Sequence, residues 1–171
     1  MRMKKTDYRA ATREDLESLW SLNITSHPGD NRWVRWKDEY IGYNLNGKAV
    51  TYAVVIDDHA VGEGTLLFSP DCRAIEGRTA LADGVSVANV NALRIIKDYE
   101  GQGHISALMR LMEREALARG YTRLTIGVDA WETRNLAIYL HWGYRDFVMA
   151  EEEDGDLVLY YAKDLKGMSD D

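Results

Sequence analysis

The chain of 171 residues is 46% hydrophobic and 29% charged, which predicts one globular domain spanning residues 1–171. Its formal net charge of −7 disfavours binding to nucleic acid, which requires clustered Lys and Arg, and favours cations such as protonated amines. With a single cysteine, Cys72, no signal-peptide core and no apolar run approaching ~20 residues, we expect a cytoplasmic protein with no disulfide, no metal site and no membrane contact.

In chain order, "DYRAATREDLESLWSL" predicts a strand and then a helix, because Thr12 with Asp15 three residues later resembles a capping box. A second helix follows the break at "TSHPGDN". The run "AVTYAVVIDDHAVGEGTLLF" predicts a β-hairpin that turns at Asp57 and Asp58. Residues 69–91 show no strong period and predict a long connection, which is a candidate for substrate contacts.

The second half alternates strands and helices. "ALRIIK" predicts a buried strand, and "HISALMRLMEREALARG" predicts a helix that ends at Gly120. "TRLTIGVD" predicts a strand, "WETRNLAIYLHW" a short helix, and "YRDFVMA" and "DLVLYYAKDL" two strands around the turn "EEEDGD". The order of strand, two helices, three strands, helix, strand, helix and two strands predicts one mixed α/β layer domain.

The segment "YEGQGHIS" places two glycines directly before a helix. A helix N-terminus offers unpaired N–H groups and a partial positive charge, which suit a phosphate. A Walker A loop requires Lys and Ser or Thr after its last glycine, where His104 and Ile105 stand, and a dinucleotide fingerprint requires a third glycine, where Ser106 stands. Both are excluded, which leaves another anion-binding loop or a tight turn.

The glycine loop, in its place after a strand, resembles the GNAT superfamily of acyl-CoA-dependent N-acyltransferases. In that family "V-x-P-x-x-R-G-x-G-I-G-x-x-L" follows the fourth strand, and the loop amides bind the pyrophosphate of acetyl-CoA. Gly101, Gly103 and Leu108 match this pattern. Glu100 replaces the usual Arg or Gln, and Ile105 replaces the usual Gly or Ala, and both changes would weaken the binding of coenzyme A.

A second match lies in "ETRNLAIYLHWGY", which is similar to the family pattern "N-x-x-A-x-x-L-Y-x-x-x-G-F". Tyr139, Gly143 and Tyr144 keep its spacing, and Asn135 stands one turn after the column of the family's asparagine. The opening strand and helix also look like those of the family, so the resemblance covers nearly the whole chain. It implies a single α/β (α+β) domain with a mixed central sheet of about seven strands, flanked by about four helices.

The resemblance also implies a site. Tyr139 would be the general acid that protonates the leaving thiolate, and the strand from Leu93 to Ile96 would offer a backbone N–H to the thioester carbonyl. The residues expected to bind acetyl-CoA are Leu93, Arg94, Ile95, Gly101, Gln102, Gly103, His104, Ile105, Ser106, Asn135 and Tyr139.

Each candidate also has a structural interpretation. Tyr139 could pack its ring with the hydroxyl at the surface, and His104 could be a solvent-facing loop residue rather than a phosphate or ribose contact. Glu63 is a candidate catalytic base, against the alternative of a solvated charge on a strand face. Asp83 and Asp129 are weaker candidates for the base.

The sequence therefore predicts an N-acetyltransferase that moves an acetyl group from acetyl-CoA to a primary amine of a small molecule, by direct attack in a ternary complex. The alternatives are acetylation of a protein N-terminus or lysine, and a non-catalytic acyl-CoA-binding regulatory module. The identity of the acceptor, the general base and the choice between a monomer and a homodimer stay open.

Overall fold

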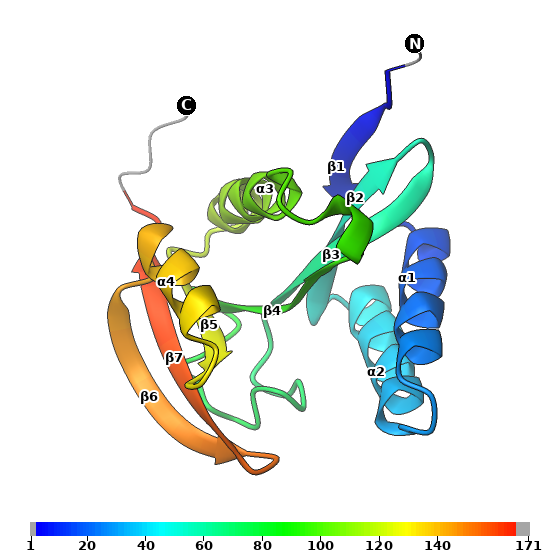
Figure 1. Ribbon diagram of the computed structural model, residues 1–171. Coiled ribbons are helices and arrows are strands. Elements are labelled where there is room, and N and C mark those ends of the chain that lie inside the picture. The colour runs from blue at the N-terminus through cyan, green and yellow to red at the C-terminus, as the bar shows by residue number, and fades with distance from the viewer. Residues whose placement is uncertain (1–2, 167–171) are drawn as a thin grey trace. The chain divides into compact units, whose positions relative to one another are not determined.

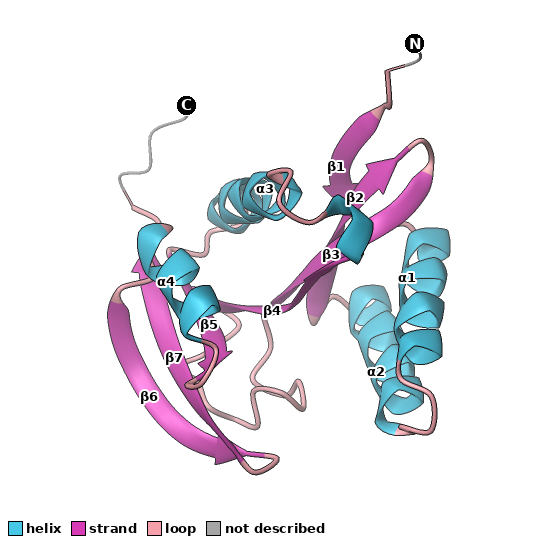
Figure 2. Cartoon of the chain, viewed as in Figure 1, coloured by secondary structure: helices cyan, strands magenta, loops and turns pink. Residues whose placement is uncertain are grey.

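The computed structural model describes residues 3–166, which form seven strands, four α-helices and one 3-10 helix (Figures 1 and 2). In chain order these elements are β1 (Thr6–Ala10), α1 (Arg13–Ser26), α2 (Arg32–Asn46), β2 (Ala49–Ile56), β3 (His59–Leu67), β4 (Val87–Ile95), η1 (Lys97–Tyr99), α3 (His104–Ala118), β5 (Arg123–Asp129), α4 (Thr133–His141), β6 (Asp146–Glu153) and β7 (Asp156–Asp164). The predicted order of strands and helices is confirmed.

The seven strands form one mixed sheet in the order β1-β2-β3-β4-β5-β7-β6. β4 and β5 are parallel, whereas β1 with β2, β5 with β7, and β6 with β7 are antiparallel. This is the predicted fold class, a mixed sheet of seven strands with four α-helices. Among the described residues, no helix has both the length and the apolar character that crossing a membrane requires.

Two compact units make up the chain, and each is described by itself. Of the described residues, the first holds 3–66 and 92–114, and in it α1 and α2 lie side by side (Figure 1). Their facing sides bury Leu16, Trp20, Tyr40 and Ile41. Thr12 accepts a hydrogen bond from the N–H of Asp15, and the Asp15 carboxylate accepts one from the N–H of Thr12, so the predicted capping box is confirmed.

Within the first unit, alternate residues of β3 and β4 face opposite sides of the sheet. A Cβ on Gly64 would lie 2.7 Å from Met112 Sδ of α3 and 2.9 Å from Leu93, so the missing side chain lets α3 approach β3 closely. Glu63 and Arg94, the neighbours of Gly64 and Leu93, direct their side chains to the other side, where α1 and α2 lie.

Of the described residues, the second unit holds 67–91 and 115–166. β4 begins at Val87, which is earlier than the sequence indicated, because Val87–Val90 pair with β5. The start of this strand was not predicted because Asn89, a polar residue in a buried position, interrupts the apolar pattern that indicates a strand. Its amide donates to Thr125 Oγ1 over 2.9 Å, and that hydroxyl donates to the carbonyl of Leu81 over 2.8 Å, so both polar groups are satisfied inside the unit.

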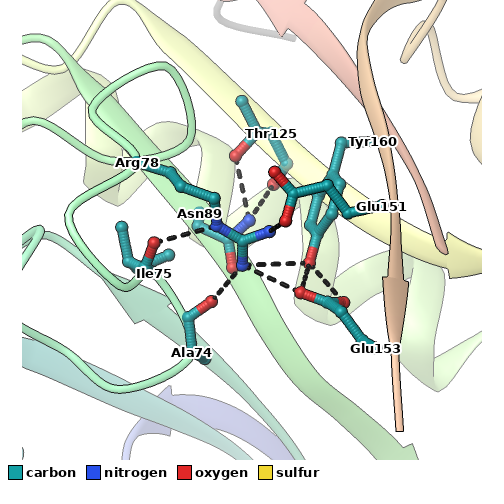
Figure 3. Close-up of polar contacts among 8 residues, drawn as sticks. All are labelled: Ala74, Ile75, Arg78, Asn89, Thr125, Glu151, Glu153 and Tyr160. Carbon is teal, nitrogen blue, oxygen red and sulfur yellow. Dashed lines mark hydrogen bonds and ion pairs between the residues drawn. The ribbon is translucent and has the colours of Figure 1, made fainter. Parts of the chain in front are cut away.

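Arg78 anchors the connection between β3 and β4 within this second unit (Figure 3). Its guanidinium donates to the carbonyls of Ala74 and Ile75, and it contacts Glu151 at 3.0 Å and Glu153 at 2.9 Å, both on β6. It also lies 5.1 Å from the centroid of the Tyr160 ring. The segment that was predicted to be a long connection is therefore held in place by charge-assisted hydrogen bonds.

Candidate active site

The glycine loop joins β4 to α3. The 3-10 turn of η1 is closed by the N–H of Glu100, which donates to the carbonyl of Lys97 over 3.1 Å. Gly101 and Gly103 then adopt φ values of +73° and +85°, in the left-handed region that favours glycine. α3 begins at His104, and its first backbone hydrogen bond runs from the N–H of Ala107 to the carbonyl of Gly103 over 3.0 Å.

Within the described part of the chain, no group accepts a hydrogen bond from the backbone N–H groups of residues 101–106. A Cβ built on Gly101 or Gly103 would meet no protein atom within 4 Å, so packing does not require glycine at either position. The loop therefore presents consecutive unpaired donors at the N-terminus of a 15-residue helix, with open space in front of its glycines. This arrangement can bind an anion.

The side chains of the loop have defined partners. His104 is partly buried, and its Nδ1 lies 2.9 Å from the hydroxyl of Tyr8 on β1, so it is not a solvent-facing loop residue. The amide of Gln102 donates to the carbonyl of Asp98 over 3.2 Å, which folds that side chain back onto the loop. The hydroxyl of Ser106 accepts from Arg110 over 2.8 Å.

Two cations that sequence reasoning missed lie near this loop. Arg110 reaches it through Ser106, and the ammonium group of Lys4 lies 5.2 Å from the centroid of the Tyr99 ring. Arg110 stands one helical turn after Ser106, a spacing that could have indicated it. Lys4 is distant in sequence, so no local pattern indicates it.

β4 is irregular directly before Leu93 to Ile96, the segment expected to offer a backbone N–H to the thioester carbonyl. In this segment the N–H of Ile96 already donates to the carbonyl of Val61 over 2.9 Å. Its parallel pairing with β5 runs from Val87 to Val90, and Ala92 then has φ of +53°. A left-handed residue inside a strand breaks the regular pleat and redirects the backbone groups that follow. Leu93, Arg94 and Ile95 therefore begin a new segment of the strand.

Glu63 is not the solvated charge that its sequence position allowed. Its side chain is only 2% exposed, and Arg94 Nη2 donates to its Oε1 over 3.1 Å. Asn23 of α1 donates to its Oε2, also over 3.1 Å. Both carboxylate oxygens are therefore engaged, and the role of Glu63 as a base stays a prediction.

The rings of Trp20 and Trp33 lie against the guanidinium of Arg94. The guanidinium carbon lies 5.1 Å from the centroid of the Trp20 ring and 5.0 Å from that of Trp33. The His27 ring stacks on Trp33 at 3.9 Å with an interplanar angle of 12°. No local sequence pattern places a cation between Trp20 and Trp33, because these contacts join segments that are far apart in the chain.

Tyr139 and Asn135 lie on α4, in the second unit. Burial, and then the nearby charge of Glu132, raise the pKa of the Tyr139 phenol above its ordinary value of 10.0, so it is protonated at neutral pH. No hydrogen bond to its hydroxyl is found among the described residues. The amide of Asn135 donates to Glu132 over 2.9 Å. The proposed contacts of both residues with acetyl-CoA stay predictions.

Asp83 ends the connection before β4. Burial alone would raise the pKa of its carboxyl group, but hydrogen bonds from the N–H groups of Val87, Ser86 and Val85 outweigh burial and lower it below 3.8. A carboxylate with a lowered pKa is a weak base, and its hydrogen bonds indicate that Asp83 stabilises the turn.

Asp129 ends β5 and differs from Asp83. Burial, followed by the charges of Glu132, Asp156 and Glu153, raises the pKa of its carboxyl group above 3.8. A raised pKa makes a carboxylate a stronger base, so Asp129 is the better of these two candidates. No cluster of three or more His, Cys, Asp or Glu side chains that could hold a metal ion occurs in the described part of the chain.

Comparison with known proteins identifies the family. Residues 10–144 match the model of the acetyltransferase (GNAT) family, and the chain belongs to this family. Membership supports acyl transfer as its chemistry. No curated protein has a significantly similar sequence.

Solved structures of the same fold cover nearly the full length of the chain. The Arabidopsis thaliana NAA60 protein in complex with acetyl-CoA is 14% identical, with a TM-score of 0.70 over 95% of this chain and 100% of that one. An aminoglycoside 6'-N-acetyltransferase complexed with coenzyme A is 16% identical, with a TM-score of 0.67 over 96% and 99%. The ribosomal-protein-S18-alanine N-acetyltransferase from Escherichia coli is 13% identical, with a TM-score of 0.70 over 97% of each chain.

Proposed function

We propose that the protein transfers an acetyl group from acetyl-CoA to a primary amine of a small molecule, by direct attack in a ternary complex. The observation that carries this proposal is the run of unpaired N–H groups at residues 101–106, in front of two open glycines at a helix N-terminus. Two of the similar structures are complexes with acetyl-CoA or coenzyme A, which supports the choice of anion.

The loop is suited to a pyrophosphate because it offers unpaired backbone N–H groups as donors and open space beside Gly101 and Gly103. Its amides donate to phosphate oxygens, and left-handed glycines such as Gly101 and Gly103 are typical of loops whose successive N–H groups converge on an anion. Arg110 and Lys4 add positive charge near the loop. Glu100 opposes them, because its exposed carboxylate adjoins Gly101 and repels phosphate.

Acetyl-CoA supplies the thioester that the amine attacks. The backbone N–H groups of Leu93 to Ile95 follow the irregular residue Ala92, and one of them donates to the developing oxyanion. An amine with an ordinary pKa near ~10 is mostly protonated at neutral pH, so a base or a water chain first removes a proton. Asp129 is the stronger candidate for that base, because the Glu63 carboxylate is only 2% exposed and already accepts hydrogen bonds from Arg94 and Asn23. Tyr139 holds the proton for the departing thiolate.

The experiment combines cofactor binding with turnover. Acetyl-CoA at about 100 times its dissociation constant should stabilise the protein by about 2.7 kcal/mol in thermal unfolding. Thiol release is then measured with a panel of small amines, and with peptides that carry a free N-terminus or a lysine. Turnover with small amines alone supports the proposal, turnover with peptides alone supports protein acetylation, and binding without turnover supports a regulatory module. No thermal shift at millimolar acetyl-CoA would contradict the cofactor assignment.

A further inference from the structure

Arg94 forms a cluster with Glu63, Asn23, Trp20 and Trp33, and this cluster contains more hydrogen-bond donors than acceptors. Arg94 Nε is buried and has no acceptor among the described residues, and the same holds for Trp20 Nε1, whose side chain is 1% exposed. The guanidinium carbon of Arg94 lies 5.1 Å from the centroid of the Trp20 ring, so the two donors belong to one cluster. Buried N–H groups without acceptors are costly, because they lose their hydrogen bonds to water and gain none in exchange.

The acidic groups of this cluster are already engaged. Glu63 accepts from Arg94 and from Asn23 and its side chain is only 2% exposed, so its carboxylate is not accessible to the ammonium group of a ligand. The two tryptophan faces that could hold a cation lie against Arg94 itself. The cluster is therefore suited to a ligand that brings acceptor oxygens rather than additional positive charge.

Arg94 is also reachable and held in place. Its side chain is 29% exposed, whereas that of Glu63 is 2% exposed, so the pair presents its cationic member to solvent. Glu63 and the two tryptophan rings restrict the guanidinium, which reduces the entropy lost when it binds an anion. Its own backbone N–H is one of the three proposed to meet the thioester.

We propose that Arg94 binds the carboxylate of the acceptor, and that the acceptor belongs to the class of free amino acids. Glu63 and Asn23 are positioning residues that hold the guanidinium. The inference rests on the proposed function, because it places the acceptor next to the strand that is proposed to donate a hydrogen bond to the thioester. In this proposal the Arg94 side chain binds the carboxylate, and the backbone of the same strand binds the thioester that the amine attacks. The acceptor must therefore carry its amine and its carboxylate close together, as an amino acid does. Polyamines and protein N-termini lack that neighbouring carboxylate.

The test compares amino acids with the amines that lack only the carboxylate: phenylalanine with phenethylamine, leucine with isoamylamine and histidine with histamine. Thiol release gives kcat/KM for each member of a pair. The two amines of a pair differ in pKa, but this difference cancels when their ratio is compared between protein variants.

The variants separate recognition from folding. Arg94→Gln combined with Glu63→Gln removes both charges, so that no unpaired carboxylate is left buried. In at least one pair, the wild-type preference for the amino acid should fall by about 10- to 100-fold, the effect of losing a charge-assisted hydrogen bond. Arg94→Lys, which keeps the charge but loses the planar fork, should retain part of the preference. Arg35→Gln, on the exposed side of α2, is the matched control and should keep all of it.

A binding measurement makes the inference independent of turnover. Calorimetry follows the N-acetyl derivative of each amino acid as it binds in the presence of coenzyme A. Binding to the wild type that is lost in the double variant supports the inference, even when no amine is acetylated and the proposed function fails. The inference would be overturned, and the proposed function left intact, if the double variant acetylates amines with an unchanged preference for the amino acid. If circular dichroism shows that the double variant does not fold, an unchanged preference in Arg94→Lys would have the same meaning. Carboxylate binding that does not depend on Arg94 would also overturn the inference.

Discussion

Replacing Gly103 by alanine separates the two reasons for a glycine in the loop. The φ of Gly103 is +85°, so a side chain costs conformational energy, about 1 to 2 kcal/mol for an L-residue in the left-handed region. A Cβ there would meet no protein atom within 4 Å, so the protein itself offers no steric objection to a methyl group. We expect a bound pyrophosphate to offer one, because it would occupy the open space beside the loop that the methyl group enters.

The chain contains a matched control for this substitution. Gly47 ends α2 with φ of +81°, and a Cβ there would likewise meet nothing within 4 Å. Gly47→Ala and Gly103→Ala should therefore lower the free energy of unfolding by similar amounts. Only the second lies in the proposed binding loop.

Calorimetric titration with acetyl-CoA measures the difference. Displacing the pyrophosphate from one charge-assisted hydrogen bond, at about 1.5 to 3 kcal/mol, weakens binding by about 10- to 150-fold. Gly103→Ala should show this loss, whereas Gly47→Ala should keep the wild-type dissociation constant within about twofold. Equal affinities in the two variants would refute the reasoning, and the glycines would then serve only the turn.

Three further predictions concern single residues. Tyr139→Phe should reduce thiol release at saturating acetyl-CoA by about 10²-fold, while stability changes by under ~1 kcal/mol and cofactor affinity stays constant. Full activity in this variant would mean that Tyr139 is a packing residue. Glu100→Arg should tighten acetyl-CoA binding in calorimetry, because a phosphate donor replaces a repelling carboxylate, and unchanged affinity would mean that the side chain points away. Asp129→Asn should raise the melting temperature at pH 7, since a carboxyl group whose pKa is raised in the folded state destabilises the fold once ionised. This gain should disappear as the pH falls toward the ordinary value of 3.8, and an increase that persists in acid would contradict it.

The elements of the fold were predictable because their signals are local. The capping box at Thr12 and Asp15 and the hairpin turn at Asp57 and Asp58 each lie within a few residues of chain. Both turn residues have positive φ, 49° and 68°, which aspartate tolerates better than most side chains do. In contrast, the left-handed Ala92 has no sequence signal, because alanine does not favour that conformation.

The candidate site was predictable in its backbone and much less in its side chains. The two glycines mark the loop by themselves, since few other features place two glycines against a helix. Asn23 and Glu63 lie 40 residues apart and meet only after the sheet and α1 have formed. The same is true of Arg94 and Trp33, which belong to β4 and α2. Such contacts depend on tertiary packing, which no short-range pattern encodes.

The discontinuity of the first unit affects how the protein is made. Residues 1–66 leave the ribosome before their partners in residues 92–114. At a synthesis rate of ~5 to 20 residues per second, about 2 to 10 s pass before Met112 can cover Gly64 on β3. During that time the face of β3 that α3 later covers is an uncovered apolar surface, available to a chaperone or to another nascent chain. Conditions that slow translation between residues 67 and 114 should therefore increase aggregation of this protein more than the same delay after residue 114.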